Sequence, residues 1–354
     1  MGDSGKELLG KPKLTQLPGF IRHGERFMII DIHCHYIPQT YFDFVENKLG
    51  YRILNAGATD DTVDVQVGPL TYKLNKTFFD PALQIVRMNR LEIDRAVISL
   101  ATPLINYGTP NHVAIEAAQL FNDELASLIA SHPDRLDGWA MLPVQAPEAA
   151  AKELERGVNK LGLRGGHIGS NVNGRYLDRP EFSPIFDAAV RLGVPLFMHP
   201  TNPPGRERME AYELAVVSGY LFDTTLSIFN MIFGGLLDRY PSLKLCCAHA
   251  GGYALTLRGR MQREVDTNPR LSGIITRSVG EYLKRLYYDT ICFEPAYLRY
   301  VADIVGLDHL LLASDGPFPL AEPDPVRFVC ESFLDNDSRS KILGSNAVKL
   351  LNLS

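Results

Sequence analysis

The chain has 354 residues, of which 45% are hydrophobic and 22% charged, the composition of a globular protein with a large core. Its net charge of -5 and the lack of a basic stripe argue against nucleic acid as a partner. Residues 1–27 lack the apolar centre of a secretory signal, and we find no apolar run of about 18 residues, so the sequence predicts a cytoplasmic protein without membrane association.

The cysteines are few and do not predict a disulfide framework. They are Cys34, Cys246, Cys247, Cys292 and Cys330. An odd count without a Cys-x-x-Cys pair predicts free thiols, which fits a reducing compartment.

The amino-terminal part predicts an arm, a strand and an insertion. Residues 1–26 are polar and contain two prolines, so we expect an arm ahead of one catalytic domain at 27–354. Residues 28–35 are an apolar run typical of a strand, and residues 36–77 form an irregular insertion. Within it, the alternation at 62–67 and 70–74 predicts a β-hairpin.

Strand-like and helix-like segments then alternate. With 28–35 as the first, the apolar runs predict strands at 95–101, 136–143, 163–169, 195–199, 243–249, 286–292 and 310–315. Asp80 and Pro81 predict the start of a helix that reaches Leu91. Further helices are expected at 111–131, 147–161 and 182–192, with a mostly helical stretch at 210–240 and a helical tail.

Eight such repeats predict a (β/α)8 TIM-like barrel. A doubly wound open sheet also alternates strand and helix, but no Gly-x-Gly-x-x-Gly follows the first strand. Reactive side chains end the first, fifth, sixth and eighth strands, and only a barrel brings these ends to one mouth. The sequence therefore favours the barrel.

The strand ends carry a candidate metal site. His33 and His35 are two residues apart and point to the same side of a strand. His199 and Asp315 end later strands, so the set offers three imidazoles and one carboxylate, which suit zinc, with manganese or another divalent ion as alternatives. His249 ends the sixth strand and is expected to act as a general acid-base, with Asp315 as a second catalytic candidate.

These motifs resemble a known family. Asp-x-His-x-His, Leu-Phe-Met-His-Pro, Ala-His-Ala-Gly-Gly and Ala-Ser-Asp-Gly-Pro-Phe-Pro, spread over residues 28–352, resemble the 2-amino-3-carboxymuconate-6-semialdehyde decarboxylase family of the amidohydrolase superfamily. The resemblance implies a distorted barrel with one zinc, non-oxidative decarboxylation and a homodimer. It assigns the four residues above as metal ligands and His249 as the acid-base residue.

The resemblance also bears on substrate binding. Arg260 matches an arginine that reaches the neighbouring subunit's site and holds a substrate carboxylate in the namesake enzyme. A second substrate-binding arginine of the family is missing from residues 71–75, where Lys73 or Tyr72 is the candidate substitute, although lysine lacks the arginine fork. In the fourth strand, Arg164 and His167 are expected on opposite faces, and His167 is the candidate substrate contact.

Two enzyme classes and one binding class remain. The first is a metal-dependent carbon-carbon lyase that decarboxylates a small unsaturated or aromatic acid with an adjacent hydroxyl, amino or oxo group. The second is a mononuclear hydrolase of a lactone, amide or ring bond, since residues 163–170 hold no lysine for a binuclear centre. The third is a non-catalytic binding protein, in which the histidines would have no catalytic role.

Overall fold

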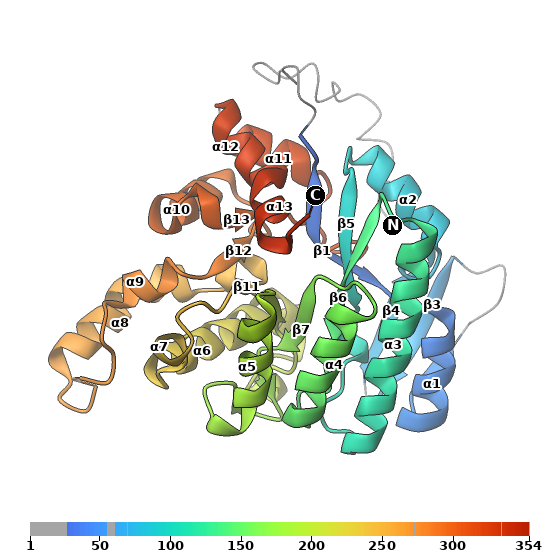
Figure 1. The fold of residues 1–354 in the computed structure, drawn as a ribbon, viewed down its shortest axis with the longest axis horizontal. Coiled ribbons are helices and arrows are strands. Elements are labelled where there is room, and N and C mark those ends of the chain that lie inside the picture. The colour runs from blue at the N-terminus through green and yellow to red at the C-terminus, as the bar shows by residue number, and fades with distance from the viewer. Residues whose placement is uncertain (1–26, 55–60, 69, 272, 334, 354) are drawn as a thin grey trace.

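Eight parallel strands form the centre of the protein (Figure 1). The computed structural model describes residues 27–54, 61–68, 70–271, 273–333 and 335–353. In sheet order the strands are β1 Ile30–Tyr36, β5 Arg95–Leu100, β6 Leu136–Met141, β7 Gly165–Gly169, β10 Leu196–His199, β11 Leu245–Cys247, β12 Tyr287–Asp289 and β13 Leu310–Leu311. They are the eight strands that the sequence predicts.

Main-chain hydrogen bonds join the two ends of this sheet. The Ile32 amide donates to the Leu312 carbonyl at 3.0 Å, and the His35 amide donates to the Gly316 carbonyl at 2.8 Å. The first strand therefore lies beside the last, which an open doubly wound sheet would not allow. The predicted (β/α)8 barrel is confirmed.

Helices cover the outside of the barrel, as Figure 1 shows. Asp80 caps the helix that begins at Pro81, since its carboxylate accepts from the amides of Ala82 and Leu83. The helices that follow the insertion are α2 Pro81–Arg90, α3 Asn111–Ser131, α4 Pro147–Asn159, α5 Ser183–Leu192, α6 Tyr220–Phe233, α7 Leu236–Arg239, α8 Ala254–Thr267, α9 Val279–Leu283, α10 Pro295–Val305, α11 Pro325–Ser332, α12 Asn336–Ser340 and α13 Asn346–Leu351.

The insertion is more ordered than the sequence predicts. The expected hairpin is present as β3 Thr62–Val67 and β4 Leu70–Asn75, and β2 Arg52–Leu54 pairs with β3 to complete an antiparallel sheet. Helix α1 Gln39–Leu49 lies in the part expected to be irregular. Its buried Tyr41, Phe44 and Val45 follow the i, i+3, i+4 spacing that predicts a helix. The predicted arm at 1–26 lies outside the described residues.

One helical stretch is more apolar than the sequence analysis indicates. Ala211–Phe233 is long and apolar enough, by length and composition, to cross a membrane. Half of an 18-residue window within this stretch is buried inside the protein, where α6 packs against α8. A helix in the interior of a globular protein has the same composition, so the stretch is weak evidence for a membrane span.

Candidate metal centre

Five side chains converge at the carboxyl ends of the barrel strands. The possible ligand atoms of His33, His199, His249 and Asp315 all lie within 4.8 Å of one another. His35 joins them, because its Nε2 is 3.0 Å from His33 Nε2 and 3.1 Å from Asp315 Oδ1. The barrel thus brings together every residue that the sequence places at the metal site, and it adds His249 to the same cluster.

Hydrogen bonds orient three of the imidazoles. The Nδ1 atoms face oxygen acceptors, which are Asp289 Oδ2 at 2.8 Å from His33, Leu100 O at 3.3 Å from His35 and Pro200 O at 2.9 Å from His199. We place a proton on each Nδ1, because a carbonyl or carboxylate oxygen requires a donor. Each Nε2 then points toward the centre, where it can bind a metal ion once it carries no proton.

This arrangement fits a divalent cation. The Nε2 atoms of His33 and His35 lie 3.0 Å apart, so either a proton or a metal ion must lie between their two lone pairs. The Nε2 of His199 is buried without a hydrogen-bond partner in the described part of the chain. Nitrogen and carboxylate donors in this combination suit zinc and several other divalent ions.

The electrostatics of the centre favour positive charge. Burial lowers the pKa of His33, but the carboxylates of Asp315 and Asp289 outweigh it and raise that pKa to about 10. Burial raises the pKa of Asp315, yet His33 and the hydrogen bonds from the histidines hold it well below its usual range. Either a proton or a metal ion can compensate these buried carboxylates.

Two of the reactive residues have an unusual backbone conformation. His249 and Asp315 have φ values of 54° and 59°, a region that residues other than glycine rarely adopt. Each such residue costs on the order of 1 kcal/mol, so surrounding contacts must maintain it. Both side chains point into the centre, where His249 Nε2 lies 3.4 Å from Asp315 Oδ2.

Asp289 is a residue of the centre that the sequence analysis missed. Its Oδ2 accepts from His33, while its Oδ1 accepts from the amides of Ala250 at 2.8 Å and Ile291 at 3.1 Å. It therefore holds the His33 ring and the loop that carries His249 together. The available signal was its position, since Asp289 ends β12 as other polar residues end their strands.

The candidate substrate contacts are divided between the centre and the surface. His167 is buried on β7 with its ring centroid 6.0 Å from that of His199, and neither ring nitrogen has a hydrogen-bond partner among the described residues. As expected, Arg164 lies on the opposite face, where its Nε is 2.6 Å from Asp137 Oδ1.

The other three candidates lie farther out. Lys73 is exposed on β4, and the half-buried Tyr72 beside it accepts a hydrogen bond from Arg206. Arg260 is exposed on α8, which Figure 1 shows at the side of the molecule opposite α2. Within this chain, Arg260 is therefore not part of the cluster around Asp315.

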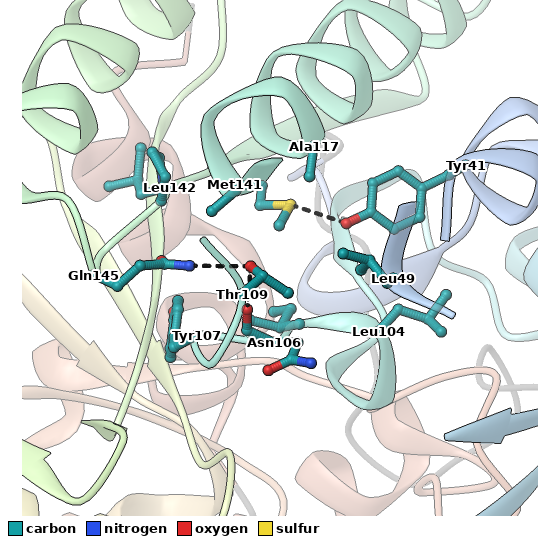
Figure 2. A pocket seen from close by; sticks show the side chains of 13 residues that line it. Tyr41, Leu49, Leu104, Asn106, Tyr107, Thr109, Ala117, Met141, Leu142 and Gln145 are labelled. Atoms are coloured by element: carbon teal, nitrogen blue, oxygen red, sulfur yellow. Dashed lines mark hydrogen bonds between the residues drawn. The ribbon is translucent and has the colours of Figure 1, made fainter. Parts of the chain in front are cut away.

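A small cavity near the barrel mouth is separate from the metal centre (Figure 2). Its volume is about 10 Å³, roughly the space of one water molecule. It lies among α1, α3 and the end of β6, where the Tyr41 hydroxyl donates to Met141 Sδ at 3.6 Å and Gln145 donates to Thr109 at 3.4 Å. None of the clustered histidines lines it, so it reflects packing beneath the insertion.

Sequence comparison relates the chain to a family of enzymes. Residues 30–353 match the family model described as Amidohydrolase. A 2-amino-3-carboxymuconate-6-semialdehyde decarboxylase of Dictyostelium discoideum is 32% identical over 93% of this chain and 92% of its own length. A gamma-resorcylate decarboxylase of Polaromonas sp. is 29% identical over 75% of this chain and 86% of its own length.

A solved structure shares the fold. A dihydroxybenzoic acid decarboxylase from Polaromonas sp., crystallised with manganese and the inhibitor 2-nitroresorcinol, matches with a TM-score of 0.76 at 24% identity. The match covers 93% of this chain and 98% of that one. The barrel is thus an architecture already seen by crystallography.

Proposed function

Because the chain belongs to the amidohydrolase family, we propose that it is a metal-dependent, non-oxidative decarboxylase of a small unsaturated or aromatic carboxylic acid. The substrate carries a hydroxyl, amino or oxo group next to the carboxylate. The observation that carries this proposal is the cluster of four imidazoles and the Asp315 carboxylate at the barrel mouth, in a chain 32% identical to a named decarboxylase. The names of the relatives favour decarboxylation over hydrolysis on the same scaffold.

The clustered residues divide into ligands and an acid-base group. We propose that His33, His35, His199 and Asp315 hold the metal, which when bound would supply Lewis acidity to stabilise negative charge on the substrate heteroatom. We propose zinc, with manganese as the alternative because the related dihydroxybenzoic acid decarboxylase contains it. Elemental analysis of the purified protein distinguishes the two.

His249 is proposed as the proton donor to the substrate carbon. Asp315 Oδ2 lies 3.4 Å from its Nε2 and can hold a proton there until the substrate takes it. Protonation of the carbon that bears the carboxylate is followed by cleavage of the carbon-carbon bond, whose electrons restore conjugation as carbon dioxide leaves. His249 then regains a proton from solvent. His167, whose ring nitrogens are unpartnered in the described chain, is the proposed contact for a polar substrate group.

We expect the metal-loaded protein to release carbon dioxide from at least one acid in a panel of ortho-hydroxy and ortho-amino aromatic acids and carboxymuconate semialdehydes. Mass spectrometry of the products measures the loss of one carbon dioxide. Matching lactones in the same panel serve as the hydrolysis control. If the lactones gain one water and every acid stays unchanged, the protein is a hydrolase and this proposal is wrong.

We propose that the protein acts as a cytoplasmic homodimer in which Arg260 binds the substrate carboxylate of the partner's site. The free cysteines support a reducing compartment. The exposure of Arg260 on α8 supports a role outside its own barrel.

Arg260→Ala is expected to raise KM by about tenfold or more with an unchanged melting temperature, because it removes a charge-assisted hydrogen bond worth about 1.5–3 kcal/mol. Arg263→Ala, also exposed on α8, is the matched control and should leave both values unchanged. Sedimentation of the parent chain checks for the dimer. An unchanged KM for Arg260→Ala would remove Arg260 from the substrate site.

A further inference from the structure

A buried polar cluster lies outside the barrel wall, behind the metal centre. It consists of Asp31, Ser314 and Arg87, and we call it the Asp31–Ser314–Arg87 cluster. Arg87 reaches it from α2, and its Nη2 lies 2.8 Å from Ser314 Oγ and 3.5 Å from Asp31 Oδ2. The Arg87 side chain is only 10% exposed and that of Asp31 is fully buried, so neither charge is solvated.

A local irregularity of β1 places Asp31 in this position. Strict alternation would put Asp31 and Cys34, three residues apart, on opposite faces of the strand. Arg87 Nη2 nevertheless contacts both, at 3.5 Å and 3.3 Å, and the pairing of β1 with β5 shifts register between them. A bulge of this kind lets His33 and His35 face the centre while Asp31 and Cys34 face α2.

The hydrogen bonds fix the charges in the cluster. Ser314 Oγ accepts from Arg87 Nη2 and from the Gly316 amide at 3.0 Å, so its own proton goes to Asp31 Oδ2. Asp31 Oδ1 accepts from the amides of His33 at 3.1 Å and Ser314 at 3.0 Å. Every partner of the Asp31 carboxylate is a donor, which is the pattern of an ionised carboxylate, and the Arg87 guanidinium balances its charge.

These same bonds hold the backbone beside two proposed ligands. Asp31 restrains the amide of His33, and Ser314 and Gly316 restrain the chain before and after Asp315. Asp315 has a φ of 59° and therefore depends on such restraint. A Cβ at Gly316 would lie 2.1 Å from Arg87 Nη2, so a side chain at this position would displace the guanidinium.

We propose that Arg87 is a positioning residue for the metal centre, which acts through Asp31 and Ser314 to fix His33 and Asp315 in metal-binding geometry. This inference rests on the proposed metal centre and not on the identity of the reaction. A lysine cannot replace the arginine, because a single ammonium does not reproduce contacts made by both Nη2 and Nε.

Arg87→Met keeps most of the buried volume and removes the guanidinium. We expect the affinity of the metal-free protein for zinc to fall by about 10- to 100-fold, the usual cost of losing a residue that orients ligands. Titration of zinc against a chromogenic chelator measures this without any substrate, so the result does not depend on decarboxylation. Arg90→Met, exposed on the same helix, is the matched control and should bind zinc as the parent does.

Cobalt loading supplies a second readout. The visible spectrum of the cobalt-loaded protein reports ligand geometry, and we expect it to change in Arg87→Met and Arg87→Lys but not in Arg90→Met. Should Arg87→Met fail to fold, Ser314→Ala tests the same inference, because it removes the hydroxyl that links Arg87 to Asp31 and Gly316. Folded Arg87→Met or Ser314→Ala protein with zinc affinity within about twofold of the parent and an unchanged cobalt spectrum would overturn it.

Discussion

His249→Ala is expected to lower kcat by about 10²- to 10⁴-fold while each chain retains its metal ion. His249 lies beside Asp315, with 3.4 Å between Nε2 and Oδ2, and its Nδ1 has no hydrogen-bond partner among the described residues. A side chain so placed can donate a proton without being needed as a ligand, because three other imidazoles and Asp315 complete a coordination set. Kinetics and metal analysis of the same preparation measure both effects.

The metal content decides between two roles for His249. The possible ligand atoms of His249 lie within the same 4.8 Å as those of His33, His199 and Asp315, so geometry alone permits coordination. Loss of metal from His249→Ala would show that His249 is a metal ligand and that another residue donates the proton. His112→Ala, at the exposed start of α3, is the matched control and should retain both metal and turnover.

Asp315→Asn is expected to lower metal affinity by more than about 100-fold and to abolish turnover, although the variant keeps the shape of the side chain. Asp315 Oδ1 lies 3.1 Å from the Nε2 atoms of both His33 and His35. An amide at this position removes the negative charge and can direct an N–H at a metal ion. We expect the loss to exceed that of a residue which only orients a ligand, for which about 100-fold is the upper range.

Zinc titration and circular dichroism test this variant together. Asp134→Asn changes the same functional group on the surface, away from the strand ends that hold the centre, and should behave as the parent. A folded Asp315→Asn protein that binds zinc with parental affinity would show that the histidines suffice as ligands. Asp315 would then remain only as a proton acceptor for His249.

The barrel could be predicted because its strands are buried on both faces. Such strands appear in a sequence as continuous apolar runs, and all eight are present. The reactive side chains that end the first, fifth, sixth and eighth runs then mark the mouth, which is how His199 and Asp315 were found. Short elements of the insertion carry weaker patterns, and α1 begins after Pro38 without a side-chain cap, so its start was not signalled.

The residues that support the centre could not be predicted in the same way. Arg87 belongs to a helix whose pattern shows only that it is amphipathic, and its partners Asp31 and Ser314 are 283 residues apart in the chain. A register shift in β1 places Asp31 toward that helix, and alternation does not reveal such shifts. Asp289 was missed because it lies inside the run predicted at 286–292, although the observed strand ends at this residue.

The closure of the barrel by its first and last strands also determines when the centre can exist during synthesis. His35 and Asp315 are 280 residues apart, so the carboxylate is synthesised long after the imidazoles of the first strand. Until then, the growing polypeptide holds imidazoles without the negative charge that completes the set. Formation of the site is thus coupled to completion of the fold, and a metal that binds there stabilises the union of the two ends of the sheet.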